Sequence, residues 1–138
     1  MTSSAKTLVA LDVGTKRIGV ARADTGTKLA FPVGTIEVDG IETERLKQIV
    51  SEIEPDVLVI GYPRNQSGEP TEQTKIVEAF AGRLASLGVP IAYQDESLTS
   101  VIAEERLAKQ RNGYKKADVD AEAACIILQD YIELHYGY

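Results

Sequence analysis

Acidic residues stand at three points of this 138-residue chain where a regular element is expected to begin or end. Asp12 closes an apolar run, the pair Asp95 and Glu96 follows another, and Asp118 and Asp120 open the last helical segment. Carboxylates gathered at one place repel one another unless a cation neutralises them, and Mg²⁺ prefers such hard oxygen ligands. Two such ions can activate a water molecule and stabilise the leaving oxygen in phosphodiester hydrolysis. If the fold brings them together, these acids predict a divalent-metal site.

Each acid also has a structural explanation that the residues alone do not remove. Asp12 stands just before Gly14, and Asp and Gly are common where a strand turns. Glu96 would pair with a cation on the surface. Asp118 suits the N-cap of the last helix, and Asp120 would be stabilised by the positive end of that helix's dipole. The three placements together favour a site more than any one of them does.

The segment from Leu8 to Ala21 is the most informative part of the chain, because an apolar run here carries a single acid. A carboxylate is costly to desolvate unless a cation or hydrogen bonds compensate it. Gly14 and Gly19 would let the backbone turn and pack closely beside that acid. Lys16 and Arg17 would hold substrate phosphates, Arg through a bidentate fork, or would simply be solvated cations of the turn.

Positive charge is concentrated in one later stretch of an otherwise acidic chain. The formal net charge is −6, yet residues 106–116 hold five cations and no acid. Such a stretch is typical of a solvated helix end or of a contact with a nucleic-acid backbone, where a tyrosine can stack on an unpaired base. The candidate nucleic-acid contacts are Lys109, Arg111, Tyr114, Lys115 and Lys116, together with Arg64 in the loop after the fourth strand.

The remaining pattern predicts the elements that must position these residues. Turn signals and apolar runs predict strands at 7–13, 17–24, 29–38, 56–61 and 89–93. Apolar residues at helical spacing predict helices at 41–53, 71–87, 99–109 and 118–133. A three-strand meander joined by right-handed crossovers to two parallel strands is an α/β fold, a five-stranded mixed sheet flanked by helices. The expected core residues of the last helix are Ala123, Ala124, Ile127, Tyr131 and Leu134, with Cys125 an inert core residue.

Length and composition set the broad class. The chain is long enough for one domain, expected over 1–138 with flexible tails at about 1–6 and 135–138. No apolar run reaches the length of a membrane span, no secretory signal is visible, and no membrane partner is expected. One cysteine allows no internal disulfide, and with a single histidine it argues against structural zinc. We therefore expect a cytoplasmic protein.

Four ordered motifs give the chain a resemblance to a known family. They are LDVGTKRIGVA at 11–21, GYP at 61–63 with its loop to Gly68, DESLTS at 95–100 and VDAEAA at 119–124. In this order and at these spacings, over about residues 8–131, the chain resembles the YqgF/RuvX family of RNase H-like nucleases. Members of that family are called pre-16S rRNA nucleases or Holliday-junction-resolvase-like proteins.

The resemblance implies an RNase H-like fold in which Asp12, Glu96 and Asp120 are the catalytic carboxylates and bind Mg²⁺ or Mn²⁺. Many RNase H-like enzymes carry their second acid at the end of the fourth strand, and Glu96 is the natural substitute here. Family members usually have an arginine after the Asp–Glu pair, whereas this chain has Ser97. That difference removes a phosphate contact or ion pair and leaves the acids intact. The expected structural residues near the site are Gly14, Gly19, Gly61 and Pro63.

The predicted function is that of a metal-dependent endonuclease acting on structured RNA, at the 5′ end of pre-16S rRNA, with ribosome association as a further expectation. One alternative is a Holliday-junction resolvase on branched DNA, which needs two active sites and therefore a dimer. A second is a non-catalytic RNA- or ribosome-binding module. The motifs leave monomer and homodimer both open. An actin-like or sugar-kinase ATPase is excluded, because 138 residues cannot supply its two domains.

Overall fold

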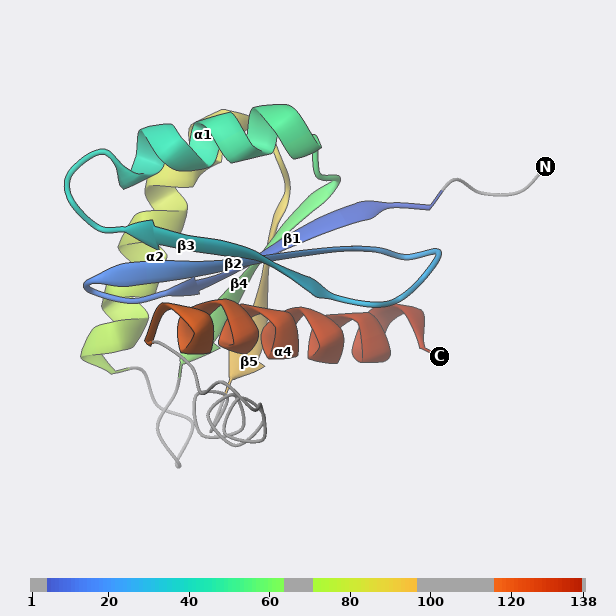
Figure 1. Ribbon diagram of the computed structural model, residues 1–138. Helices are drawn as coiled ribbons and strands as arrows, with labels where there is room; N and C mark the ends of the chain where they lie inside the picture. Colours follow the sequence, from blue (N-terminus) through green and yellow to red (C-terminus); the bar gives the residue numbers. More distant parts are fainter. Residues whose placement is uncertain (1–4, 64–70, 97–115, 138) are drawn as a thin grey trace.

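A five-stranded mixed sheet forms the centre of the molecule (Figure 1). The computed structural model describes residues 5–63, 71–96 and 116–137, and this description does not extend to the side chains of residues 96 and 116–118. The strands are β1 (Thr7–Val13), β2 (Arg17–Asp24), β3 (Phe31–Glu37), β4 (Val57–Pro63) and β5 (Ile91–Glu96). They lie in the order β3-β2-β1-β4-β5. Strands β1 to β3 are antiparallel and β4 and β5 run parallel to β1, which confirms the predicted fold class.

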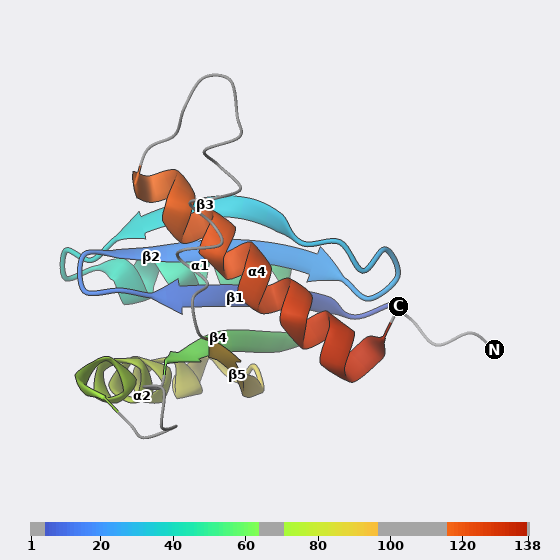
Figure 2. The ribbon, with the colours of Figure 1, turned by 90° about the horizontal axis from the view of Figure 1, so that it is seen from below.

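Helices cover both faces of this sheet. The described ones are α1 (Glu42–Ile53), α2 (Glu72–Leu84) with the short 3₁₀ turn η1 (Ala85–Leu87), and α4 (Lys116–Tyr136). Figure 1 shows α1 and α2 on one face and α4 on the other. In Figure 2 α4 crosses the sheet diagonally, and its N-terminal end lies at the end of the sheet where β1 turns into β2. The helix predicted at 99–109 falls outside the described residues.

The alternation of side chains along each strand divides the core into two halves. In β1, Val9, Leu11 and Val13 belong to the core beneath α1 and α2, whereas Leu8 and Ala10 belong to the core beneath α4. The next residue in the second series is Asp12, which is partly exposed. The part of β1 that α4 covers is therefore apolar up to the last position on that face, which carries a carboxylate.

Small residues let α4 approach the sheet closely. Ala10, Ala21 and Ala23 are buried beneath it, and Cys125 is buried in the same cluster as predicted. The prediction for Leu134 was wrong, because 72% of this side chain is exposed. Leu134 lies about 200° around the helix from Ile132. Because Leu128 and Ile132 take the face of α4 that packs on the sheet, Leu134 points away from it.

Strand and helix ends differ from the prediction at several points. Strand β3 begins at residue 31 instead of 29, and β4 continues through Tyr62 to Pro63 instead of ending at Gly61. Strand β5 reaches Glu96, and α4 extends two residues earlier and three residues later than predicted. Within the described residues, no helix is long and apolar enough to cross a membrane. The lengthened β4 and β5 matter for the site, because both carry predicted site residues at their ends.

Candidate functional site

Gly19 brings the first and last of the predicted acids to the same point of the sheet. Asp12 pairs with Gly19 across β1 and β2, and paired Cα atoms lie about 5 Å apart. Gly19 has no side chain, and the backbone of α4 occupies the space where one would lie. A Cβ atom built on Gly19 would lie 1.9 Å from the carbonyl oxygen of Asp120. The backbone of Asp120 therefore rests directly on the strand residue opposite Asp12.

The side chain of Asp120 is held by a cation from the same strand. Arg17 stands two residues before Gly19, and its Nε atom donates a hydrogen bond to Asp120 Oδ2 at 2.7 Å. The two side chains are 27% and 24% exposed. This hydrogen bond and the charge of Asp120 raise the pKa of Arg17 above its usual value. Arg17 thus fixes a predicted metal ligand, and its predicted contact with substrate phosphate stays a prediction.

The third predicted acid lies at the end of β5, which is separated from β1 by β4. Glu96 pairs with Pro63, the last residue of β4. Ala92 packs in the core beneath α4, so alternation along β5 places position 96 on that same face and Asp95 on the opposite one. Two strand spacings put the backbones of β1 and β5 about 10 Å apart. Positions 12, 96 and 120 thus share one face at one end of the sheet.

Whether the three carboxylates form a cluster lies outside the description, because the side chain of Glu96 is not part of it. Among the side chains that are described, no group of three His, Cys, Asp or Glu residues could hold a metal. The side chain of Asp118 is likewise not described. The assignment of Asp12, Glu96 and Asp120 therefore stays a prediction, which the backbone positions favour.

The predicted structural residues lie around this end of the sheet. Gly14 donates its N–H to the carbonyl of Arg17 at 3.0 Å in the β1–β2 turn, and a Cβ atom on Gly14 would lie 2.7 Å from that oxygen. Gly61 pairs with Gln94 on β5 and contributes no side chain between β1 and β5. Lys16 is exposed in the turn. The nucleic-acid contacts predicted at Arg64, Lys109, Arg111, Tyr114 and Lys115 lie outside the described residues, as does the side chain of Lys116.

Two contacts from α2 to this end of the sheet were not predicted. Gln73 Nε2 donates to the carbonyl of Val13 at 2.6 Å, and Thr74 Oγ1 donates to the carbonyl of Pro63 at 2.5 Å. Thr71 and Thr74 cap the helix reciprocally. The sequence signal that could have indicated this turn is a threonine followed three residues later by a polar residue, just before an apolar helix.

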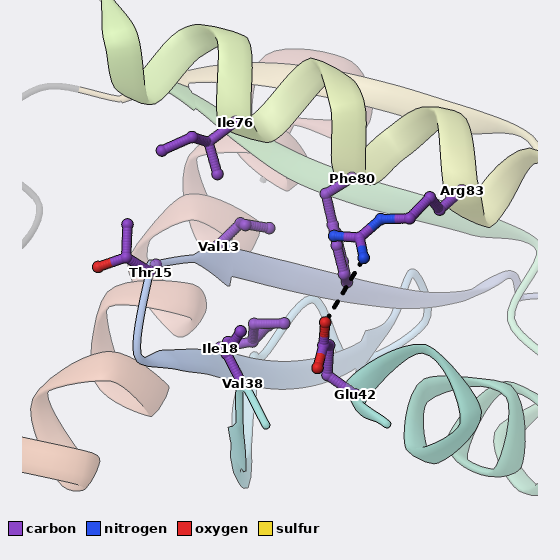
Figure 3. Close-up of a pocket in the computed structure, with 9 residues that line it drawn as sticks. Val13, Thr15, Ile18, Val38, Glu42, Ile76, Phe80 and Arg83 are labelled. Carbon is purple, nitrogen blue, oxygen red and sulfur yellow. Dashed lines mark hydrogen bonds and ion pairs between the residues drawn. The ribbon is translucent and has the colours of Figure 1, made fainter. Parts of the chain in front are cut away.

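A separate cavity of about 200 Å³ lies behind the β1–β2 turn on the α1/α2 face (Figure 3). Apolar side chains such as Ile18 and Phe80 line it. At its wall Arg83 lies 4.9 Å above the Phe80 ring, and its Nη1 atom is 3.5 Å from Glu42 Oε2. Asp12 is not among the residues that line this cavity, which lies at the same end of the sheet as the acids but on the opposite face.

Comparison with known proteins assigns a family to this fold. The sequence model of the RuvX family, described as "Holliday junction resolvase", matches residues 6–134. The chain belongs to the RuvX family. A protein of Shewanella oneidensis named "Putative pre-16S rRNA nuclease" is 42% identical over 140 residues, covering 97% of this chain and 99% of that protein. A protein of Gloeothece citriformis with the same name is 43% identical over 128 residues, covering 89% and 85%.

Solved structures of low sequence identity share the fold of this RuvX chain. RuvC of T. thermophilus in complex with a Holliday junction substrate has a TM-score of 0.60 at 12% identity, covering 96% of both chains. The Holliday junction resolvase of fowlpox virus has a TM-score of 0.57 at 14% identity, covering 93% of this chain and 99% of that one. The family and the names of its close relatives are those of nucleases, so this RuvX chain is a nuclease.

Proposed function

We propose that this RuvX protein is a divalent-metal-dependent endonuclease that hydrolyses phosphodiester bonds in precursor 16S rRNA. Asp12, Glu96 and Asp120 would be the metal-binding carboxylates. The observation that carries the proposal is the contact at Gly19, because it sets the backbone of Asp120 against the residue paired with Asp12. Asp12 lies on a strand and Asp120 on a helix, and the close approach of α4 to β2 is what brings their backbones together.

The donor atoms available at this end of the sheet suit Mg²⁺ or Mn²⁺. Carboxylate oxygens are hard ligands, and among the described residues the only cysteine and the only histidine lie in α4 beyond Asp120, with Cys125 in the core. On one side of β1, Gly61 adds no side chain that would fill the space beside Asp12, and on the other side Gly19 makes room for the backbone of Asp120. When bound, the metal would activate a water molecule and stabilise the leaving oxygen.

The chain's own residues provide the positioning. Arg17 holds Asp120 at 2.7 Å and neutralises part of the negative charge that three acids would otherwise share. Glu96 stands at the end of β5, where its backbone is fixed by pairing with Pro63. Lys16 is exposed in the turn that follows Asp12, and we propose that it contacts a phosphate of the substrate.

Relatives favour RNA over branched DNA as the substrate. The proteins named for pre-16S rRNA are 42% and 43% identical to this chain, whereas the resolvases that share its fold are 12% and 14% identical. We therefore propose that it acts in the maturation of the 5′ end of the small-subunit RNA, in the cytoplasm and in association with ribosome precursors. Paired cutting of a DNA junction would instead require two copies of the site.

The test is cleavage of a precursor 16S rRNA fragment with Mg²⁺ or Mn²⁺ by the wild type and by Asp12→Asn, Glu96→Gln and Asp120→Asn. Each substitution should reduce the rate by more than about 100-fold, because each removes a ligand. The matched control is Asp95→Asn, which changes a neighbouring acid on the opposite face of β5 and should cut at nearly the wild-type rate.

Three results would redirect the proposal. Equal cleavage by the wild type and Asp12→Asn would refute the mechanism. Symmetric cutting of a four-way DNA junction by a dimer, with no cutting of the RNA, would favour the resolvase. If calorimetry detected no binding of Mn²⁺ to the wild type and no substrate were cut, a non-catalytic RNA-binding module would be the better conclusion.

A further inference from the structure

The first turn of α2 contacts the ends of two neighbouring strands, β1 and β4. The two contacts come from consecutive residues, Gln73 and Thr74, and both are made to backbone carbonyls. The carbonyl that Gln73 binds belongs to the residue after Asp12. The carbonyl that Thr74 binds belongs to Pro63, which pairs with Glu96. One helical turn thus touches the backbone beside two of the three proposed metal ligands.

Gln73 binds β1 beyond the point where the hydrogen-bond ladder between β1 and β4 ends. The pairing of β1 with β4 extends only to Leu11 and Ile60. Hydrogen bonds of an antiparallel pair alternate along the strand, and Gly14 bonds to Arg17 on β2. The carbonyl of Val13 is therefore directed to the other side of β1, towards β4. The amide of Gln73 supplies the donor there, at 2.6 Å.

Thr74 performs the corresponding task for β4. Its side chain is fully buried, and its hydroxyl is fixed from two sides. Thr74 Oγ1 accepts a hydrogen bond from the backbone N–H of Thr71 at 2.9 Å and donates one to the carbonyl of Pro63 at 2.5 Å. The carbonyl oxygen of Pro63 can only accept, so the single hydroxyl proton of Thr74 is used in this bond. The end of β4 is held in the sheet at the residue that pairs with Glu96.

We propose that Gln73 and Thr74 are positioning residues of the nuclease, and that together they fix the backbones that carry Asp12 and Glu96. Neither side chain is assigned any contact with substrate or metal. They act by preventing the ends of β1 and β4 from separating beyond the last ladder pair. The inference rests on the proposed function, since the acids they position are the proposed metal ligands.

The variants that test this proposal change the shape of the side chain little. Gln73→Met removes the bond to Val13, and Thr74→Val removes both the bond to Pro63 and the bond accepted from the N–H of Thr71. Gln73→Met and Thr74→Val remove the donors, and Thr74→Ser keeps the hydroxyl and should restore wild-type behaviour. The matched control is Gln129→Met. Gln129 makes the same kind of bond, from Nε2 to the carbonyl of Lys28 at 2.9 Å, but it does so far from the acids. All four variants are compared with the wild type as full-length protein.

Two measurements separate positioning from general stability. Amide hydrogen exchange should become faster at residues 11–14 in Gln73→Met and at Gly61 and Tyr62 in Thr74→Val, and should stay unchanged there in Gln129→Met. The Kd for Mn²⁺, measured by calorimetry, should rise about 10-fold in Gln73→Met and Thr74→Val, as for other residues that orient metal ligands. Thr74→Ser and Gln129→Met should bind Mn²⁺ within about twofold of the wild type.

The outcomes distinguish this proposal from the proposed function. If Gln73→Met and Thr74→Val bind Mn²⁺ as tightly as the wild type, the positioning role is wrong, and the proposed function is unaffected. The positioning role is also wrong if Gln129→Met weakens Mn²⁺ binding as much as Gln73→Met does, because the effect would then follow stability alone. If the wild type itself neither binds Mn²⁺ nor cuts RNA, the proposed function fails first, and the positioning role fails with it.

Discussion

Replacing Gly19 with alanine is the most direct perturbation of the candidate site, because it adds one methyl group between β2 and α4. The new Cβ atom would lie 1.9 Å from the carbonyl oxygen of Asp120, 2.3 Å from its carbonyl carbon and 2.9 Å from the nitrogen of Ala121. All three are backbone atoms of a helix, so no side chain can rotate to make room. The first turns of α4 must move away from the sheet.

The displacement required can be worked out from these distances. Real Cβ contacts essentially never fall below 3.0 Å, so the carbonyl of Asp120 must move by at least about 1.1 Å. Excess volume in a packed core usually costs about 1–3 kcal/mol. We expect the upper end, about 3 kcal/mol, because α4 also carries one half of the core. For a chain of this length that is roughly a 10 °C decrease in Tm.

The functional effect should exceed what the lost stability explains. A misplacement of about 1 Å in a catalytic arrangement can reduce the rate about 100-fold. The assays are thermal unfolding, RNA cleavage with Mg²⁺ well below the Tm of the variant, and calorimetric binding of Mn²⁺. The matched control is Gly82→Ala in α2, where an added Cβ atom has no neighbour within 4 Å. That variant should gain about 0.5–1 kcal/mol from helix propensity and keep full activity.

A Gly19→Ala protein with the wild-type Tm would refute the packing argument. If instead the Tm falls as expected but the folded variant cuts RNA and binds Mn²⁺ like the wild type, Asp120 does not act at the place where α4 presents it. The site would then have to be rebuilt without that residue.

Three further predictions concern charge and burial. The Glu42 carboxylate accepts hydrogen bonds from the backbone N–H groups of Glu42 and Gly40, and these bonds hold the pKa of Glu42 below its usual value. The ionised side chain therefore stabilises the folded protein fully at pH values above the unfolded pKa of about 4.3. This stabilisation is lost as the pH falls through the lower, folded pKa of Glu42. Between about pH 5 and pH 3, the urea midpoint of the wild type should therefore fall more than that of Glu42→Gln. Arg17→Gln should lower the urea midpoint of the metal-free protein at low salt, with a smaller difference at about 1 M salt because the pair with Asp120 is partly exposed. Cys125 is only 5% exposed, so it should react with a thiol reagent only as fast as the protein unfolds. The rate of labelling, followed over time with and without urea, would measure this.

The sequence pattern predicts where a strand or helix ends when the residues that end it are neighbours in the sequence. The bounds of β1 and β2 agree with the prediction because Gly14, Thr15 and Lys16 interrupt two apolar runs. The start of β3 does not agree, because long-range bonds hold the preceding loop. Gln129, about a hundred residues away, bonds to the carbonyl of Lys28 and accepts from the N–H of Ala30. Such contacts leave no trace in a window of ten residues.

At the end of β4, contacts distant in the sequence lengthen the strand beyond its predicted end. A tyrosine followed by a proline is typical of a loop, so the predicted strand ended at Gly61. Pairing with β5 and the hydroxyl of Thr74 instead keep Tyr62 and Pro63 in the sheet. Proline is tolerated at a strand end, where its missing N–H removes no ladder bond that the sheet needs.

The assignment of Asp12, Glu96 and Asp120 as ligands stays a prediction. The topology that brings their backbones to one end of the sheet was predicted from the sequence, but the register that aligns them was not. Topology alone puts the ends of β1 and β5 and the start of the last helix near one another. The pairing of Asp12 with Gly19 depends on the length of the β1–β2 turn, and the rotation of α4 that presents Asp120 depends on packing along the whole helix. The choice of Glu96 over Asp95 came from a resemblance, and alternation along β5 now gives it an independent physical basis.

The acids are placed from both faces of the sheet at once. On one face α4 rests on Gly19 and brings Asp120, and on the other α2 binds the carbonyl beside Asp12 through Gln73. The ladder between β1 and β4 ends one residue short of Asp12, so strand pairing alone does not hold this end. The geometry of the site must therefore depend on how tightly both helices pack. It follows that substitutions which loosen the contact of either helix with this end of the sheet should weaken metal binding by more than their effect on stability explains.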